Sequence, residues 1–140
     1  MNDLDFDQRL FRINKLYTEK SNHNLKEFNV TRSDMSFLFK LNEMGETTQK
    51  DLAESRNLNN ATVTRALERL EKKGFVKRVD DEKDKRKKNV FLTHEGKRII
   101  NKILKKHNSY KKEIFKDFNE NEFHNLMTLL DKLLFNLENI

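Results

Sequence analysis

The stretch that decides the fold is residues 58–93, which read LNNATVTRALERLEKKGFVKRVDDEKDKRKKNVFLT. A segment with strong helix signals and many cations leads directly into two short apolar segments, which flank the charged tip DDEKDKRKK. Residues 65–88 contain 11 Lys and Arg against 6 Asp and Glu, so this stretch carries +5 of the formal net charge of +6. A cationic helix followed by a charged hairpin is the layout of a winged helix-turn-helix, and the local charge indicates double-stranded DNA as partner.

Helix signals also dominate the rest of the chain, which contains no proline and 3 glycines. Apolar residues at helical spacing predict an amphipathic helix over residues 5–20. T-x-x-D capping boxes at Thr31 and Thr48 predict two more helices, of which the first ends near Gly45 and the second near residues 56–57.

The quoted stretch itself predicts a fourth helix and a hairpin. The helix should be capped by Asn59 or Asn60 and end where Gly74 supplies a left-handed residue. Residues 75–79 and 89–93 read as two short strands, and the tip between them is too charged to be buried. The predicted fold class is therefore mainly α with a small β-hairpin wing, a winged helix-turn-helix flanked by terminal helices.

Composition limits the class of protein further. A length of 140 residues suits one domain, and 35% hydrophobic against 37% charged residues predicts a small core that is completed by a second subunit. Absence of cysteine excludes disulfides, thiol-based sensing and cysteine-ligated zinc. The acidic start MNDLDFD is unlike an export signal, and no apolar run approaches the roughly 18 residues that span a bilayer. We expect a soluble, cytoplasmic, nucleoid-associated protein without a membrane partner.

Two long amphipathic helices are predicted after the hairpin, and they meet near Asn119. Together with the first helix they carry more apolar surface than one subunit needs. We therefore predict a homodimer. The expected organisation is one domain over residues 1–140, with dimerisation helices in residues 1–30 and 94–140 around a DNA-binding lobe in residues 31–93.

The fourth helix has one apolar and one polar face at about 100° per residue. Val63, Leu67 and Leu70 form the apolar face and should be core. On the polar face, an arginine can make a two-pronged contact to guanine O6 and N7 in the major groove. The residues predicted to face bases are Asn60, Thr62, Thr64 and Arg65, and those predicted to meet phosphates are Arg69 and Lys72. The alternative is a solvated face on which Glu68 and Lys72 form an ordinary i,i+4 pair.

The hairpin tip contains the sequence DKRKK, residues 84–88. An arginine such as Arg86 can enter a narrow, A·T-rich minor groove, where the negative potential is strongest. Asp84 would orient Arg86 through a charge-assisted hydrogen bond, and Lys87 and Lys88 add cations beside it. The alternative is a soluble turn without a ligand.

The segments LAESRNLNNATVTRALERLEKKGFVKR, DEKDKR and NVFLTHEG resemble the MarR/SlyA family of bacterial transcriptional regulators over residues 47–96. The resemblance implies a homodimer with intertwined terminal helices, whose two recognition helices enter successive major grooves of a pseudo-palindromic operator, most often as a repressor. It implies a DNA-binding role for Asn60, Thr62, Thr64 and Arg65 in the helix, Asp84 and Arg86 in the wing, and Thr48 and Gln49 at the DNA backbone. Glu82 departs from the family, whose wings commonly have proline there.

The resemblance also implies that a small lipophilic or phenolic effector releases DNA. The candidate pocket residues are Tyr17, Phe28, Met35, Phe39 and Tyr110, although aromatic and methionine residues at helical spacing are more often core. No metal site is expected, since Ile103 and Lys111 stand one turn from His107 where a second ligand would be needed. No cofactor is expected.

Parts of the sequence are also compatible with two other classes of function. Carboxylates in residues 81–84 resemble a Mg²⁺ site, but they lie on an exposed turn, and no phosphate-binding loop or nucleophile with its base is visible. We therefore predict that the chain is not an enzyme. The open alternative is an effector-independent or architectural DNA-binding protein that prefers A·T-rich DNA.

Overall fold

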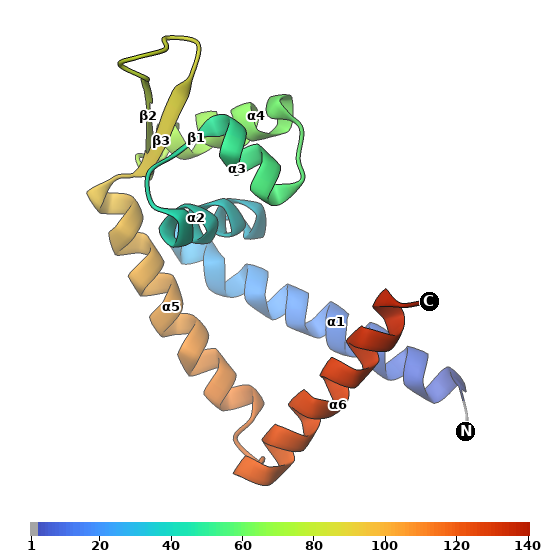
Figure 1. Cartoon of the computed structure of the whole chain (residues 1–140). Helices are drawn as coiled ribbons and strands as arrows, with labels where there is room; N and C mark the ends of the chain where they lie inside the picture. The colour runs from blue at the N-terminus through green and yellow to red at the C-terminus, as the bar shows by residue number, and fades with distance from the viewer. Residues whose placement is uncertain (1–2) are drawn as a thin grey trace. The chain divides into compact units, whose positions relative to one another are not determined.

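Helices dominate the computed structural model, which describes residues 3–140 (Figure 1). In chain order the elements are α1 (Asp3–Leu25), the short 3-10 helix η1 (Lys26–Phe28), α2 (Arg32–Met44), β1 (Thr47–Thr48), α3 (Gln49–Arg56), α4 (Asn60–Lys72), β2 (Val76–Asp80), β3 (Lys88–Leu92), α5 (His94–Ile114) and α6 (Glu120–Glu138). The chain divides into two compact units: the first ends at Lys105, within α5, and the second is Lys106–Ile140.

The sheet in the first unit is antiparallel, with the strand order β1-β3-β2. The wing hairpin pairs Val76 with Leu92 at its base and Asp80 with Lys88 near its tip. Both strands lie within one residue of the predicted positions. Phe75 is not in a strand because its N–H donates to the carbonyl of Leu70 and so completes the end of α4. The two-residue strand β1 was not predicted, since so short a strand has no alternating pattern.

Side-chain caps begin the helices at the predicted residues. Thr31 and Asp34 form a complete capping box on α2, and Asn119 forms another with Glu122 on α6. On α3, Thr48 accepts a hydrogen bond from the N–H of Asp51. Asn59 caps α4 by accepting from the backbone N–H three residues on, which settles the choice between Asn59 and Asn60. Local sequence therefore determines where each of these helices starts.

The lengths of two helices differ from prediction. α1 continues to Leu25 because nothing in residues 21–25 breaks a helix, and a left-handed Asn29 then ends the 3-10 turn. α5 ends at Ile114, and in the second unit the ring of Phe115 makes edge contacts with Phe118 and Phe123. None of the described helices combines the length and the hydropathy that a bilayer-spanning helix requires.

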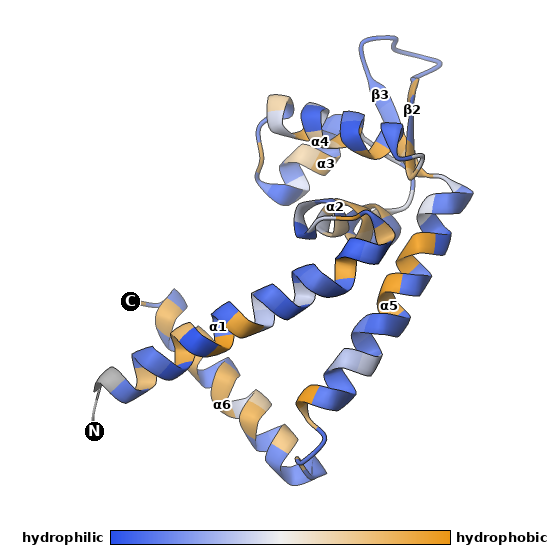
Figure 2. Ribbon diagram, turned by 180° about the vertical axis from the view of Figure 1, so that it is seen from behind, coloured by the Kyte–Doolittle hydropathy of each residue, from blue (hydrophilic) through white to orange (hydrophobic). Residues whose placement is uncertain are grey.

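The core of the first unit lies between α2, α3, α4, the sheet and the start of α5. The hydropathy colouring in Figure 2 shows apolar residues on the inner sides of these helices. Val63, Leu67 and Leu70 are buried, as predicted from the apolar face of the fourth helix. Other fully buried side chains are Leu38, Leu41, Leu52, Val90 and Ile100. Burial of this face leaves the opposite face of α4 in solvent.

A buried carboxylate joins α2 to the C-terminal end of α4. Asp34 is 0% exposed, and its two oxygens accept from Arg69 Nη2 at 3.2 Å and Lys73 Nζ at 2.7 Å. Burial opposes ionisation of Asp34, but the hydrogen bonds from Lys73, the Thr31 N–H and Arg69 outweigh it, so the pKa of the carboxyl is lowered. The ionised form is therefore part of the folded structure.

Replacing Asp34 by Asn should lower the free energy of unfolding at pH 7 by about 2–3 kcal/mol, because hydrogen bonds to a charged buried group are lost. Since the folded-state pKa of Asp34 is lowered, its contribution is complete above the unfolded value of about 3.9 and is lost as the pH falls through the folded value. Urea unfolding between pH 7 and pH 3 should therefore show the stabilities of wild type and Asp34→Asn converging below about pH 4.

The control is Glu43→Gln, an exposed residue of the same helix, which should change stability by less than about 1 kcal/mol. A gap between wild type and Asp34→Asn that stays constant down to pH 3 would contradict this role of the carboxylate.

Candidate nucleic-acid interface

The N-terminal half of α4 presents small and hydrogen-bonding side chains to solvent. Asn60, Ala61 and Arg65 are exposed, and Thr62 and Thr64 are partly exposed. The cap at Asn59 fixes the first turn of this helix, and the buried apolar face fixes its rotation. The small side chain of Ala61 permits close approach of a flat or grooved surface to the helix backbone.

Gln49, predicted to meet the DNA backbone, lies instead behind the side chains predicted to face bases. It is 8% exposed, and its Nε2 donates to Asn60 Oδ1 at 2.9 Å and to Thr64 Oγ1 at 2.6 Å. The side-chain oxygen of Gln49 accepts from Arg78 Nη1 at 3.4 Å. Arg78 on β2 is itself held by Glu71, with Arg78 Nε 2.7 Å from Glu71 Oε1. The structure therefore gives the Gln49 side chain a supporting position that its place in the sequence did not predict.

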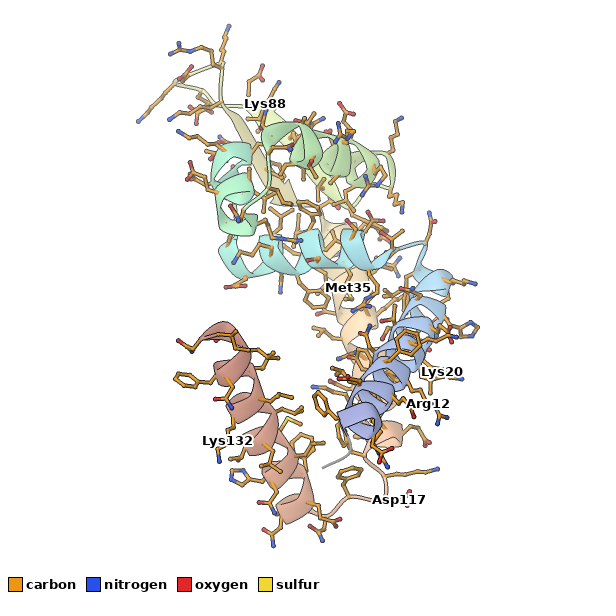
Figure 3. The ribbon with its side chains drawn as sticks, turned by 90° about the vertical axis from the view of Figure 1, so that its right-hand side faces the viewer. Arg12, Lys20, Met35, Lys88, Asp117 and Lys132 are labelled. Carbon is orange, nitrogen blue, oxygen red and sulfur yellow. The ribbon has the colours of Figure 1, made fainter. Side chains whose placement is uncertain are left out.

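The start of α3 and the wing line one groove of about 340 Å³ (Figure 3 labels Lys88 on the wing). This groove brings together predicted residues from three parts of the chain. Its lining consists of Thr48, Gln49, Lys50, Asp51, Asn60, Arg86, Lys87 and Lys88. Four of these eight side chains are cationic and one is anionic, so the groove favours an anion. Lys50 was not among the predicted site residues, because no motif distinguishes it from other exposed lysines.

Two aspartates shape the wing tip. Asp81 Oδ1 accepts from the backbone N–H groups of Lys83 and Asp84, at 2.8 and 3.2 Å. Asp84 Oδ1 accepts from both the N–H and the Nε of Arg86, at 3.1 and 3.2 Å, and these bonds hold the pKa of Asp84 below its ordinary value. The side chain of Arg86 is 92% exposed. The predicted D-x-R contact is therefore present, and Asp81 supplies order to a turn that has Glu82 in place of proline.

The two cations predicted to meet phosphates differ in their surroundings. Lys72 is exposed at the end of α4. Arg69 forms the ion pair with buried Asp34, although its side chain remains 48% exposed. Arg69 therefore has a structural partner inside the lobe, which its helical position did not reveal.

Of the five residues predicted to line an effector pocket, Met35 and Phe39 share a shallow groove of about 620 Å³ on α2. Figure 3 labels Met35 on this helix. Arg56, at the end of α3, also lines the groove; its Nη1 is buried with no hydrogen-bond partner among the described residues, and its guanidinium lies 4.7 Å from the centre of the Phe37 ring. The remaining predicted residues are Phe28, which packs against the core, Tyr17 on α1, and Tyr110 in the second unit.

The small-molecule pocket accordingly stays a prediction from the sequence. Among the side chains that the structure describes, those of residues 5–140, no cluster of His, Cys, Asp and Glu suits a metal ion.

Comparisons with known proteins agree on the class of protein to which this chain is similar. The HTH-type transcriptional regulator YwoH of Bacillus subtilis is 35% identical over 108 residues, which cover 77% of this chain and 78% of the relative. A mutant of S. aureus MepR has a TM-score of 0.79 at 26% identity, covering 93% of this chain and 97% of that one. Another MepR mutant, bound to an oligodeoxyribonucleotide, has a TM-score of 0.68 at 25% identity over 93% of this chain and 96% of that one. Fold and relatives define a winged helix-turn-helix transcriptional regulator.

The MarR family model matches residues 30–88, which include α2, α3, α4 and most of the wing. The chain belongs to the MarR family. Members of this family are transcriptional regulators, so the chain is not an enzyme.

Proposed function

We propose that this protein is a homodimeric, sequence-specific DNA-binding repressor that binds a pseudo-palindromic operator. The observation that carries the proposal is the shared groove at the start of α3, which adjoins both the wing cations and the first turn of α4. The MepR mutant of similar fold, which binds an oligodeoxyribonucleotide, supports DNA as the ligand. A DNA-binding regulator of this kind works in the cytoplasm at the nucleoid.

In this proposal each part of the surface has a separate role. Asn60, Thr62, Thr64 and Arg65 meet base edges in the major groove, with Arg65 positioned for guanine. Phosphates are met by Thr48, by the groove lysines Lys50, Lys87 and Lys88, and by Lys72 farther along α4. Arg69 contributes through its remaining exposed surface, and Gln49 acts from behind Asn60 and Thr64. Arg86 enters the minor groove while Asp84 limits its orientations.

Binding of the protein to a library of genomic DNA fragments at near-physiological salt tests the function directly. We expect the enriched fragments to contain an inverted repeat whose half-sites lie about one helical turn apart. Arg65→Ala should weaken binding to that repeat by about 1–3 kcal/mol and relax preference at one position of each half-site. Lys72→Ala is the control. Because Lys72 is proposed to contact phosphate, this substitution should weaken binding to all DNA sequences by the same factor. An unchanged binding motif for Arg65→Ala would refute the base contact.

A second experiment concerns the wing. Arg86→Ala should weaken binding most where A·T-rich DNA flanks the half-sites, because a narrow minor groove has the strongest negative potential. Affinities for operators with A·T-rich and G·C-rich flanks would be compared by fluorescence anisotropy. Lys83→Ala, at the same tip, serves as control and should lower both affinities by the same factor. Equal losses for Arg86→Ala on the two flanks would exclude minor-groove entry.

The homodimer is supported by apolar surface on the terminal helices. On α1, Phe11 and Ile13 are exposed, and on α6 Leu134 and Phe135 are 55% and 65% exposed. α6 has no buried residue among those described. Apolar surface of this extent marks an interaction site in a protein of this size. We therefore assign dimerisation to residues 1–30 and 94–140 and DNA binding to residues 31–93, within one functional domain over residues 1–140.

The double substitution Leu134→Lys and Phe135→Lys should abolish the dimer, since each of these side chains contributes roughly 1.5–3 kcal/mol when fully buried. Sedimentation velocity would measure the change, and binding to the full inverted repeat should weaken together with dimerisation. Asn136→Lys, an exposed polar position of the same helix that points away from both side chains, is the matched control. Persistence of the dimer in the double variant would contradict the assignment.

Release by a small lipophilic or phenolic effector is supported by the α2 groove. Met35 and Phe39 offer an apolar wall, and Arg56, which also lines the groove, offers a cationic side chain to a phenolate or carboxylate oxygen. The affinity of the protein for its operator should fall when salicylate is added but not when benzyl alcohol, which lacks the acidic oxygen, is added. Arg56→Met should remove the response to salicylate. No effect of either compound on wild type would favour the effector-independent alternative, as would enrichment of A·T-rich DNA without a repeat.

A further inference from the structure

The side-chain amide of Gln49 makes three hydrogen bonds, and their directions are determined by its partners. Its oxygen accepts from Arg78, while its nitrogen donates to Asn60 Oδ1 at 2.9 Å and to Thr64 Oγ1 at 2.6 Å. Gln49 is 8% exposed, so water does not readily replace these partners. The three bonds connect α3 and β2 to the first two turns of α4.

The orientation of this amide cannot be reversed without loss. A guanidinium has only donors, so the group of Gln49 that faces Arg78 has to be the oxygen. Arg78 in turn is held by Glu71, through an Nε–Oε1 distance of 2.7 Å and an Nη2–Oε1 distance of 2.6 Å. Reversing the amide would place its NH₂ against the guanidinium, donor against donor. Glu71 and Arg78 therefore determine that Gln49 presents its NH₂ to α4.

This orientation determines which hydrogen-bonding groups remain for a ligand of α4. Because Asn60 uses its oxygen to accept from Gln49, its own NH₂ is left as a donor. Because the Thr64 oxygen accepts from Gln49, the hydroxyl hydrogen of Thr64 is also left to donate outward. Both side chains are at least partly exposed. The surface at the start of α4 is therefore polarised toward donation.

We propose that Gln49 is a positioning residue that sets the base preference of this regulator by making Asn60 and Thr64 donors. In the major groove, guanine offers two adjacent acceptors, N7 and O6, and thymine offers O4, whereas adenine has the donor N6 beside its acceptor N7 and cytosine offers only the donor N4. Asn60 contacts adenine in the usual two-pronged way only when both its oxygen and its NH₂ face the base. The polarised surface consequently favours guanine or thymine opposite Asn60 and Thr64. This inference rests on the proposed function, since it requires α4 to lie in a major groove.

Selection of binding sites from random double-stranded oligonucleotides, followed by sequencing, tests the inference with the full-length protein. Gln49→Leu removes the amide at similar size and should reduce discrimination at the affected position by roughly 5- to 10-fold, which is near the lower end of what one good base contact contributes. Gln49→Glu presents only acceptors, so Asn60 and Thr64 would turn their donors inward. The preference should then move toward bases with an outward donor, adenine or cytosine.

Two further variants separate positioning from general effects. Lys50→Gln, at the neighbouring exposed residue, lowers the net charge by one unit, as Gln49→Glu does. It should weaken binding to all DNA sequences by the same factor and leave the selected motif unchanged. Thr64→Val keeps Gln49 in the chain but removes the outward hydroxyl, together with the oxygen that accepts from the Gln49 amide, and should abolish the same base preference. This variant keeps the test decisive if thermal unfolding shows that a Gln49 variant does not fold.

The outcomes distinguish the proposed function from the proposed role of Gln49. Wild-type protein that selects no motif would overturn the proposed function, and this inference with it. A discrete wild-type motif that is retained unchanged by Gln49→Leu, Gln49→Glu or Thr64→Val, in variants that fold, would overturn the inference alone. A motif that loses its guanine or thymine with Gln49→Leu and acquires adenine or cytosine with Gln49→Glu would establish it.

Discussion

The orientation of α4 is the constraint on which the rest of the DNA-binding lobe depends, and buried polar side chains from two other helices fix it. Asp34 of α2 holds the C-terminal end of α4 through Arg69 and Lys73, and Gln49 of α3 holds its first two turns. Apolar burial is not directional. It determines which face of α4 is inside, but small rotations and shifts of the helix change its free energy little. Hydrogen bonds in a low-dielectric interior do depend on direction, and an unpartnered group there is costly. Base recognition needs that directional component.

The ion pairs that hold α4 also account for part of the positive charge of residues 65–88. Of the 11 cations in residues 65–88, Arg69, Lys73 and Arg78 form ion pairs with carboxylates inside the lobe. These three belong first to the architecture of α4 and its neighbours. The cations of the wing tip and of the groove beside α3 are the ones whose surroundings suit phosphate. Net charge therefore predicts the same surface that we propose for DNA binding, but it does not distinguish cations that stabilise the lobe from cations that face outward.

Sequence reasoning recovered the features that depend on local pattern. Helical spacing predicted the apolar face of α4, capping residues predicted where α2, α3 and α6 begin, and the charged turn predicted the wing. The features it missed depend on partners distant in the chain. Asp34 was predicted as half of a capping box, but its contact with Lys73 joins two residues that are 39 positions apart in the chain. Gln49 was placed at the DNA backbone by its position at the start of α3, whereas its burial results from α4 and β2 packing over it. A short strand such as β1, with two residues, carries no periodicity at all.

The position of α2 sets a physical condition on any regulation of this lobe by a small molecule. α2 carries the buried Asp34 on one side and lines the Met35–Phe39 groove on another. A compound in that groove can change DNA affinity only if it binds more tightly to one arrangement of α2 and α4 than to another. Allosteric coupling free energies are typically about 1–3 kcal/mol, the same order as the contribution of a charged hydrogen bond. An effector that displaces α2 enough to weaken the Asp34 contacts would therefore change the free energy of the C-terminal end of α4 by a sufficient amount, without contacting the α4 residues that we propose to face bases.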